Sequence, residues 1–267
     1  MKQFLFILLA IVALSCSSNY EKPAHTVQNQ QQKDSLVNVM QASYELQLSQ
    51  VYNIPANDYI AYYLKLDEIT YETRTSDSYS YEKSYSRDWN MLFYNTVTQK
   101  YHTLFQQNQQ VIEKSYLGTT SLPTTSDLFE DEYATEEVKK EPNSASQQFL
   151  FFEVIHDDFT ADGLLTYKDP TYLYRTDLMG KNLRQLSPKN YDVINWGFPK
   201  NNSLLVMTTR KDSNRDKKFT EHDQTVIWGI DILADQPAYQ LFPDSYLDSL
   251  KKQYLESLIK VGKAPKG

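Results

Sequence analysis

The chain has 267 residues, of which 40% are hydrophobic, so it holds enough apolar material for one large domain or two small ones. Its 34 Asp and Glu residues outnumber its 27 Lys and Arg residues, and phosphate backbones repel such a charge, which argues against a nucleic-acid partner. Seven glycines are present and no two of them frame a phosphate-binding turn, so we expect no nucleotide, while the many Tyr and Phe residues favour β-strands.

The first residues have the pattern of an export signal. Lys2 gives a positive start, and residues 4–14 are apolar throughout. This apolar run is too short to span a bilayer, for which about 20 residues are needed. We therefore predict a signal peptide in residues 1–15.

The end of this signal contains Ala13-Leu14-Ser15-Cys16, which resembles the lipobox of bacterial lipoproteins. The resemblance implies cleavage before Cys16, a diacylglycerol on its sulfur, and attachment to a membrane of the bacterial cell envelope through that lipid. Ser17, in place of Asp, is similar to the pattern that sorts lipoproteins to the outer membrane. Two alternatives stay open: a cleaved signal peptide in which Cys16 is incidental, and an uncleaved anchor.

The segment after the signal is polar. Residues 16–35 are predicted to be a flexible tether, because the run of Gln and Asn at 28–32 cannot bury enough apolar surface to order itself. Residues 36–267 are predicted to form a single β-rich domain. Two of its first segments alternate at strand period, with apolar faces made by Tyr44, Leu46 and Leu48 and by Ile60, Tyr62, Leu64 and Leu66.

Three later segments each have an apolar strand, a short turn and a return strand. They are residues 91–105, 172–186 and 226–241, and we expect three hairpins of one kind. The charged residues 127–142, which lie between the first and second hairpins, are predicted to be a solvated insertion.

The C-terminal residues 244–261 are predicted to form an amphipathic helix. Pro243-Asp244-Ser245 is a helix-start signal, and apolar residues then recur at helical spacing. We expect the apolar side of this helix to dock on a sheet, and docking on a membrane is the alternative.

The second hairpin carries a resemblance to a known family. Its strand ends in Asp177-Leu178, turns on Gly180 and returns to Leu186-Ser187, and this resembles the repeat of TolB-type β-propellers. Residues 196–205 are similar to the turn that precedes that repeat. The resemblance implies propeller-like antiparallel sheets, of which three units are recognisable, whereas a closed propeller has four to eight. Either residues 36–70 hide a fourth unit or the sheets form an open stack, and an antiparallel sandwich with similar hairpins is the alternative fold.

A segment with an acidic loop occurs twice, 54 positions apart (212 − 158 = 54). Such self-similarity is typical of one supersecondary unit used repeatedly. The identical pairs are Asp158 and Asp212, Asp162 and Asp216, Thr166 and Thr220, Asp169 and Asp223, Asp177 and Asp231, Leu150 and Leu204, and Thr171 and Thr225.

Both acidic loops space their oxygen atoms as an EF-hand-like calcium loop does, at loop positions 1, 3, 5, 7, 9 and 12. The first set of predicted ligands is Asp158, Thr160, Asp162, the Leu164 carbonyl, Thr166 and Asp169. The second set is Asp212, Asn214, Asp216, the Lys218 carbonyl, Thr220 and Asp223. The sequence thus predicts two calcium sites, and the alternative is a pair of Asp-rich turns that bind nothing.

Two details predict weak calcium sites. Gly163 stands at the sharp turn of the first loop, whereas Lys217 occupies that place in the second, where a positive φ disfavours a side chain. Both loops also end in Asp instead of Glu, so we expect dissociation constants of roughly 10⁻⁴ to 10⁻³ M.

The sequence contains no catalytic motif, because no Gly-x-Ser-x-Gly elbow or metal-ligand spacing of His is present. We expect a non-catalytic envelope lipoprotein whose calcium-stabilised sheets form a binding or scaffolding surface for another envelope protein. The alternative is a lipoprotein that binds polysaccharide or peptide through an aromatic surface, for which Tyr71, Tyr79, Tyr81 and Tyr85 are the candidates.

Overall fold

The computed structural model describes residues 28–68, 88–107, 110–117, 146–163, 165–199, 203–234 and 236–259. In this part the chain is mainly β, with three antiparallel sheets and two helices. The predicted signal peptide, Cys16 and the charged segment 127–142 lie outside the described residues.

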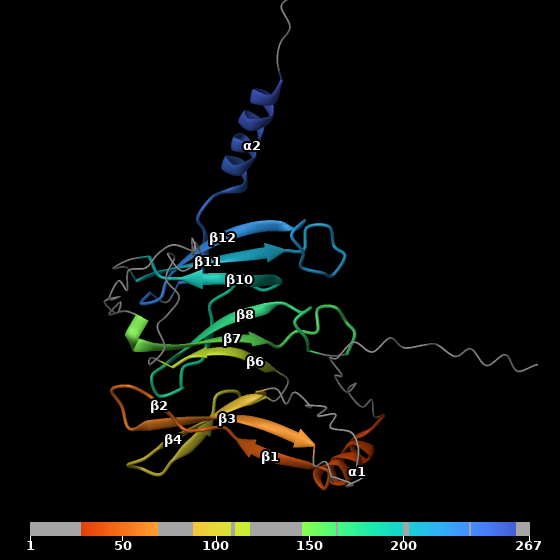
Figure 1. The fold of residues 1–267 in the computed structure, drawn as a ribbon, viewed down its shortest axis with the longest axis vertical. Helices are drawn as coiled ribbons and strands as arrows, with labels where there is room; N and C mark the ends of the chain where they lie inside the picture. The colour runs from red at the N-terminus through yellow and green to blue at the C-terminus, as the bar shows by residue number, and fades with distance from the viewer. Residues whose placement is uncertain are drawn as a thin grey trace, which may run out of the picture.

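The three sheets follow one another along the chain and are stacked (Figure 1). The first contains β1 (Tyr44–Leu48), β2 (Tyr52–Asn53), β3 (Tyr59–Glu68), β4 (Asn90–Asn95) and β5 (Tyr101–Thr103). The second contains β6 (Val111–Tyr116), β7 (Phe149–Ile155), β8 (Thr171–Asp177) and β9 (Arg184–Gln185), with the 3-10 helix η2 (Ser146–Gln148) before β7. The third contains β10 (Tyr191–Gly197), β11 (Leu204–Lys211), β12 (Gln224–Asp231) and β13 (Tyr239–Gln240).

The first sheet has the same four-strand plan as the other two. β1 and β2 pair with different parts of β3, while β4 pairs with its other edge, so β1 and β2 act as one interrupted strand. Ser49 bridges the interruption, because its backbone N–H donates to the Tyr63 carbonyl and its hydroxyl accepts from the Tyr63 N–H. Residues 44–68 therefore belong to the first sheet, and the described residues form an open stack of three sheets without a fourth.

The three predicted hairpins are confirmed as the last two strands of each sheet. They share one turn chemistry. In each hairpin, the last residue of the first strand accepts, with its side-chain oxygen, the backbone N–H of the residue two positions later, at 2.9 to 3.1 Å. Asn and Asp side chains favour this turn because they can replace a backbone acceptor. The three residues are Asn95, Asp177 and Asp231.

Two hydrophobic cores lie between the sheets, and the second sheet contributes to both. The core between the first and second sheets contains Ile54, Ala61, Met91, Phe93, Leu104, Ile112, Leu117, Leu150, Phe152 and Val154. The core between the second and third contains Phe151, Leu173, Leu186, Val193, Trp196, Phe198, Leu205, Met207, Ile230 and Ile232. Strand β7 is nearly continuously apolar because both of its faces are buried.

Glu153 is the exception in β7. Its carboxylate accepts hydrogen bonds from the Tyr116 hydroxyl and the Trp196 indole N–H, each at 3.0 Å, and lies 3.4 Å from the Lys114 ammonium. These partners satisfy a charge that would otherwise be costly to bury. Burial, together with the Glu153 charge, raises the pKa of Tyr116.

In the strands that precede the two acidic loops, β7 and β11, equivalent residues lie 55 positions apart instead of 54. Leu150 pairs with Thr176, and Leu205 pairs with Ile230. Since Thr176 and Ile230 are equivalent (176 + 54 = 230), the equivalent of Leu150 is Leu205, 55 positions on. The predicted equivalence of Leu150 with Leu204 is therefore wrong, because a one-residue slip turns a side chain to the other face.

The first and second sheets also meet at a turn. Gly180 has a φ of +72°, and a Cβ there would lie 2.6 Å from the ring of Phe93. Asn57 donates from its side-chain amide to the Leu178 carbonyl at 2.6 Å. The turn of the second hairpin therefore packs directly on the first sheet.

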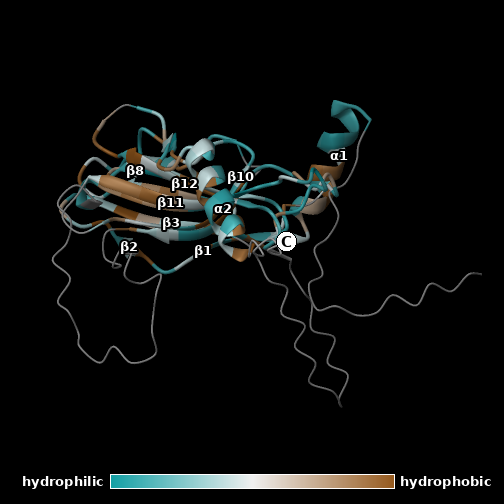
Figure 2. Cartoon of the chain, turned by 90° about the horizontal axis from the view of Figure 1, so that it is seen from above, coloured by the Kyte–Doolittle hydropathy of each residue, from teal (hydrophilic) through white to brown (hydrophobic). Residues whose placement is uncertain are grey.

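Helix α1 (Gln30–Gln41) begins inside the segment predicted to be a flexible tether. Its N-cap is Asn29, whose side-chain oxygen accepts the Gln32 N–H, which satisfies one of the free donors at the helix start. None of its residues is buried, and Figure 2 shows this hydrophilic helix apart from the sheets.

Helix α2 (Asp244–Leu258) confirms a helix in the predicted range 244–261, although residues 260–261 lie outside the described residues. The expectation that it docks on a sheet is wrong, because none of its residues is buried and it projects away from the stack (Figure 1). Neither α1 nor α2, the two helices in the described ranges, is long and apolar enough to cross a membrane.

Candidate functional site

The two acidic loops lie one above the other on the same side of the stack (Figure 1). One joins β7 to β8 and the other joins β11 to β12. The rings of Phe159 and Phe219, one from each loop, are in contact, with 4.9 Å between their centroids. The internal repeat therefore brings the two predicted calcium loops together.

The two loops share a backbone conformation. Positions 4 and 6 have a positive φ in both: 59° at Ala161 and 85° at Gly163 in the first, 63° at Arg215 and 61° at Lys217 in the second. The prediction that Lys217 occupies a position that favours Gly is confirmed. A non-Gly residue there costs roughly 1 kcal/mol.

The carboxylate at position 1 closes each loop. Asp158 accepts the N–H groups of Asp162 and Gly163 at 3.0 and 2.9 Å. Asp212 accepts those of Asp216 and Lys217 at 3.2 and 3.1 Å. These bonds hold the chain in its tight turn, so both oxygens of each carboxylate already have donors.

The carboxylate at position 12 fixes the other end of each loop and is buried. Asp169 accepts the N–H groups of Thr160 and Thr166 at 3.1 and 2.9 Å. Asp223 accepts those of Thr220 and Ser213 at 2.9 and 3.0 Å, and these donors hold the pKa of its carboxyl below the ordinary value. Asp169 and Asp223 are only 2% and 6% exposed, because their carboxylates are turned inward to these donors of their own loops.

The remaining predicted ligands also make bonds within the loops. The Thr160 and Thr220 hydroxyls donate to the position-12 carboxylates, and the Thr166 hydroxyl accepts the Lys168 N–H. Asn214 and the Lys218 N–H bond to Asp216, and Leu164 lies outside the described residues.

The hydrogen bonds within the two loops bear on whether these residues fit a calcium ion. Within the described ranges, no three His, Cys, Asp or Glu side chains are placed to hold a metal. The position-1 and position-12 carboxylates are met by N–H donors from their own loops. Calcium binding therefore stays a prediction of the sequence.

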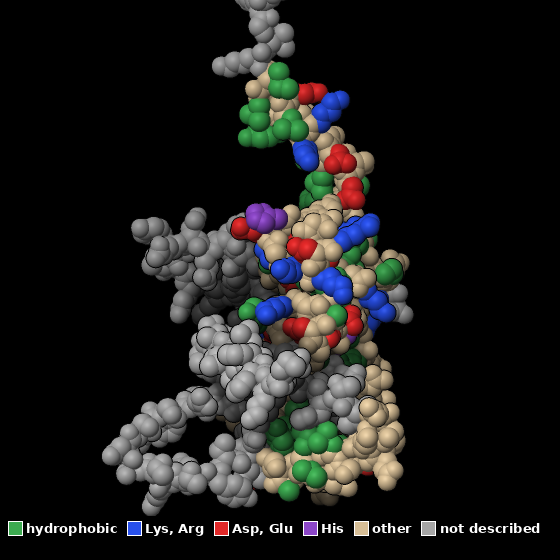
Figure 3. All heavy atoms as spheres, turned by 90° about the vertical axis from the view of Figure 1, so that its right-hand side faces the viewer, with side chains coloured by type: hydrophobic (Ala, Val, Ile, Leu, Met, Phe, Trp, Pro, Cys, Tyr) green, Lys and Arg blue, Asp and Glu red, His purple; other side chains and the backbone are tan. Residues whose placement is uncertain are grey.

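A hollow of about 580 Å³ lies between the two loops. Charges of both signs gather over this part of the surface in Figure 3. The hollow is lined by Thr160, Asp162, Tyr167, Lys168, Asp169, Asp192, Asp216, Lys217, Lys218 and Phe219. It brings together the predicted residues Thr160, Asp162, Asp169, Asp216 and Lys218.

Asp192 in this lining was missed by sequence reasoning. Its carboxylate accepts the Thr171 N–H at 3.0 Å, and burial raises its pKa. The signal in the sequence was an acidic residue at the start of a mostly apolar strand, Tyr191–Gly197.

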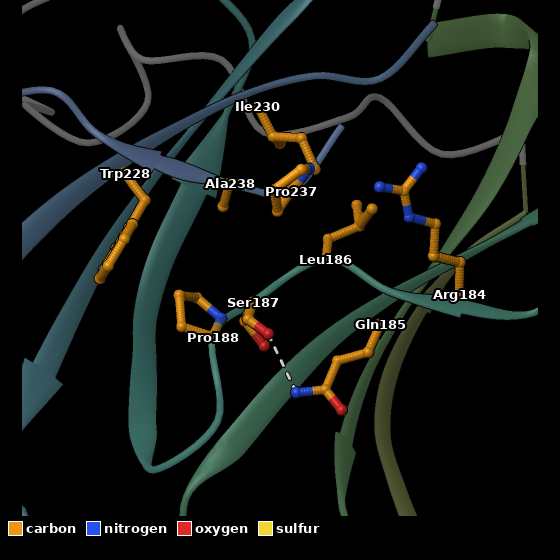
Figure 4. A pocket seen from close by; sticks show the side chains of 9 residues that line it. All are labelled: Arg184, Gln185, Leu186, Ser187, Pro188, Trp228, Ile230, Pro237 and Ala238. Atoms are coloured by element: carbon orange, nitrogen blue, oxygen red, sulfur yellow. Dashed lines mark hydrogen bonds between the residues drawn. The ribbon is translucent and has the colours of Figure 1, made fainter. Parts of the chain in front are cut away.

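A second and smaller concavity lies between the second and third sheets, where Arg184 reaches the segment before β13 (Figure 4). The guanidinium donates to the carbonyls of Ala234 and Gln236 at 3.5 and 2.6 Å. The concavity measures about 250 Å³. Because ligand pockets usually measure about 300 to 1,000 Å³, we interpret it as part of the packing between sheets.

No protein-family model matches the chain, and a search of curated proteins found no match. Conclusions about function therefore rest on the residues of the chain itself.

Proposed function

We propose that this chain is a non-catalytic lipoprotein of the bacterial cell envelope whose propeller-like sheets, together with helix α2, carry a binding surface for another envelope protein. The observation that supports this most is helix α2. Its apolar residues Leu250, Tyr254 and Leu258 are 42%, 67% and 62% exposed. They lie on one side of the helix, which is the arrangement that an amphipathic helix uses to bind in a groove of a partner.

The test compares two double variants in capture from detergent-solubilised membranes. Leu250→Glu with Tyr254→Glu places two charges on the apolar side of α2. Ser245→Glu with Ser249→Glu adds the same charges at the same spacing on the polar side. We expect the first pair to abolish capture of the partner and the second to leave it unchanged. Equal capture by both pairs would exclude α2 as the binding element.

The lipid anchor is the second part of this proposal and is supported by the lipobox at Ala13-Leu14-Ser15-Cys16. The lipid would hold the protein at the membrane, with the outer membrane favoured by Ser17. The sheets would then face partners in or along the envelope.

Calcium is the third part. The ligand spacing and the shared positive φ values at positions 4 and 6 support it. The residues of the two loops that would contribute oxygens are those predicted above, and the ion would supply positive charge among carboxylates that otherwise repel. The alternative is that the loop N–H groups alone stabilise these carboxylates.

One observation favours the alternative function of binding a polysaccharide or a peptide. Tyr167 is 70% exposed and lines the hollow beside Asp162 and Asp216, an arrangement that can stack on and hydrogen-bond a polar ligand. The four Tyr candidates between residues 71 and 85 lie outside the described residues. A glycan array would test this function, with Tyr167→Ala losing binding and Tyr101→Ala, a 74% exposed control in the first sheet, retaining it.

A further inference from the structure

Each sheet has two faces. We call the face on the side of the preceding sheet its trailing face and the face on the side of the following sheet its leading face. The same names apply to the outer faces of the first and third sheets. Strand β8 shows both kinds of face. Tyr174 on the trailing face packs in the core shared with the first sheet. Leu173 on the leading face packs in the core shared with the third sheet.

The shared turn residues Asn95, Asp177 and Asp231 define equivalent positions in the three sheets. Two residues before each turn residue, the side chain belongs to the leading face. One residue before, it belongs to the trailing face. The leading positions are Phe93, Arg175 and Gly229, and the trailing positions are Tyr94, Thr176 and Ile230.

Within the part of the chain that the structure describes, this equivalence leaves two faces without a partner sheet. The leading faces of the first and second sheets pack on the sheets that follow them, and the trailing faces of the second and third pack on the sheets that precede them. The trailing face of the first sheet and the leading face of the third sheet are left at the two ends of the stack. A contact between a leading face and a trailing face already occurs twice within the molecule, once in each core. The two end faces are one of each kind.

The free trailing face of the first sheet is apolar. Leu46 is opposite Leu66 and Leu48 is opposite Leu64, so these side chains share one face. Leu46, Leu48 and Leu66 are 55%, 52% and 48% exposed, whereas Leu64 is buried. Tyr62 opposite Leu92, and Ile60 opposite Tyr94, extend the same face. The described side chains on this face include no charged group.

The free leading face of the third sheet is apolar in its middle and polar at its two ends, where Arg210 is opposite Thr225 and Leu204 is opposite Asp231. Val206 is opposite Gly229, which is opposite Tyr239 on its other side. A Cβ at Gly229 would lie 3.1 Å from the Tyr239 ring and 3.2 Å from Leu204, so the glycine lets both lie against the sheet. Tyr239 is 53% exposed, and Ile227 and Leu204 lie on the same face.

We propose that a second copy of this chain covers both free faces. The trailing face of the first sheet in one copy packs on the leading face of the third sheet in the other. Two such contacts related by a two-fold axis close six sheets into a ring. Contacts between unlike faces close into rings when the rotation permits, and six sheets fall within the usual four to eight of a closed propeller. The occupant is a second copy because this chain itself supplies both complementary halves of the repeated interface.

The test uses the full chain in detergent and measures the mass of the protein part of the particle by light scattering. Leu66→Lys places a charge on the free trailing face, and Tyr239→Lys places one on the free leading face. Val97→Lys, at a 70% exposed position in the turn between β4 and β5, is the matched control. Thermal melts verify that each variant is folded.

We expect two chains per particle for the wild type and for Val97→Lys, and one chain for each face variant at the same concentration. A mixture of Leu66→Lys and Tyr239→Lys chains with different tags should form a two-chain particle again, because one pair of unaltered faces remains between them. This recovery distinguishes unlike faces from a face that pairs with itself.

Three outcomes would overturn the proposal. A wild type that stays a single chain at about 100 μM would exclude a specific pair, since stable interfaces bind more tightly than that. An effect of one face variant without the other would indicate like faces in contact. Particles that grow beyond two chains with concentration would show that the ring does not close. Loss of partner capture by the α2 variants would leave these masses unchanged, so the two proposals fail independently.

Discussion

Lys217 and Gly163 occupy the same left-handed position of two similar loops, one with a side chain and one without. The Lys217→Gly change should raise the free energy of unfolding by about 1 kcal/mol, because glycine adopts a positive φ without steric strain. Gly163→Ala should lower it by a similar amount. A Cβ at Gly163 meets no atom within 4 Å, so this loss would come from the backbone alone. Chemical denaturation measures both changes, and equal stabilities across the three proteins would contradict the left-handed turn.

His156 should make the stability depend on pH. Its ring stacks on Tyr172, with 4.4 Å between ring centroids, and burial lowers its pKa below 6.5 although the neighbouring Asp157 charge acts in the opposite direction. The unfolded chain therefore binds more protons than the folded chain just below pH 6.5. The stability that neutral His156 contributes is fully present above its pKa in the unfolded chain. It is lost as the pH falls through the pKa of His156 in the folded chain.

The measurement compares denaturation midpoints at about pH 8 and pH 5.5, on either side of the ordinary pKa of His. His156→Phe keeps an aromatic ring against Tyr172 but removes the titrating group, so the variant should lose less stability on acidification than the wild type. His102, whose pKa is also lowered by burial, is present in both proteins and cancels in the comparison. Identical pH profiles would show that His156 is not the responsible group.

At the scale of the elements, the sequence predicted the hairpins because each has an apolar strand, a short turn and a return strand. It did not predict the one-residue offset of Leu205, since Leu204 and Leu205 are both Leu and only the strand pairing with β12 tells them apart. The apolar spacing in residues 244–258 predicted helix α2. The same spacing cannot tell what covers the apolar side, and for this reason the expected docking was wrong.

The candidate site was predictable as far as it depends on local spacing. The position-1 and position-12 carboxylates lie in loops whose turns the sequence marks with Asp, Gly and Thr. The contact between Phe159 and Phe219 and the approach of Asp192 depend on how the second and third sheets stack, which no local pattern records.

The acidic loops give a prediction for calcium. At about 1 mM calcium and a dissociation constant of about 10⁻⁴ M, each occupied site adds roughly 1.4 kcal/mol to the free energy of unfolding. Since each kcal/mol raises the melting temperature of a domain of this size by about 2 to 4 °C, two sites should raise it by several degrees. Asp162→Ala should remove more of this gain than Asp216→Ala, because the first loop has glycine at its tight turn.

A thermal melt with calcium and with chelator measures this gain, and magnesium at the same concentration is the control for ionic strength. A melting temperature that is indifferent to calcium and chelator would leave the loops stabilised by their own N–H donors.

At the scale of the whole molecule, the proposed lipid anchor gives a prediction for Cys16. Metabolic labelling with a fatty-acid probe should mark the wild type and not Cys16→Ala. The variant should remain unprocessed or leave the membrane fraction, because a protein without the lipid has no anchor at this position. Cys16 is the single cysteine of the chain, so thiol labelling elsewhere cannot confuse the result. Equal labelling of both proteins would contradict the lipobox.

The close approach of Gly180 to Phe93 has a consequence for how the molecule folds. Each described sheet is built from consecutive strands, and each core joins only neighbouring sheets, so cooperativity is passed from one sheet to the next as in a repeat protein. Gly180→Ala would force a methyl group into the Phe93 ring and weaken one of the two couplings. Amide hydrogen exchange should then quicken in β3 and β4 while β11 and β12 stay protected, because local opening need not spread beyond the weakened junction. Uniformly faster exchange in all three sheets would show instead that they unfold as one unit.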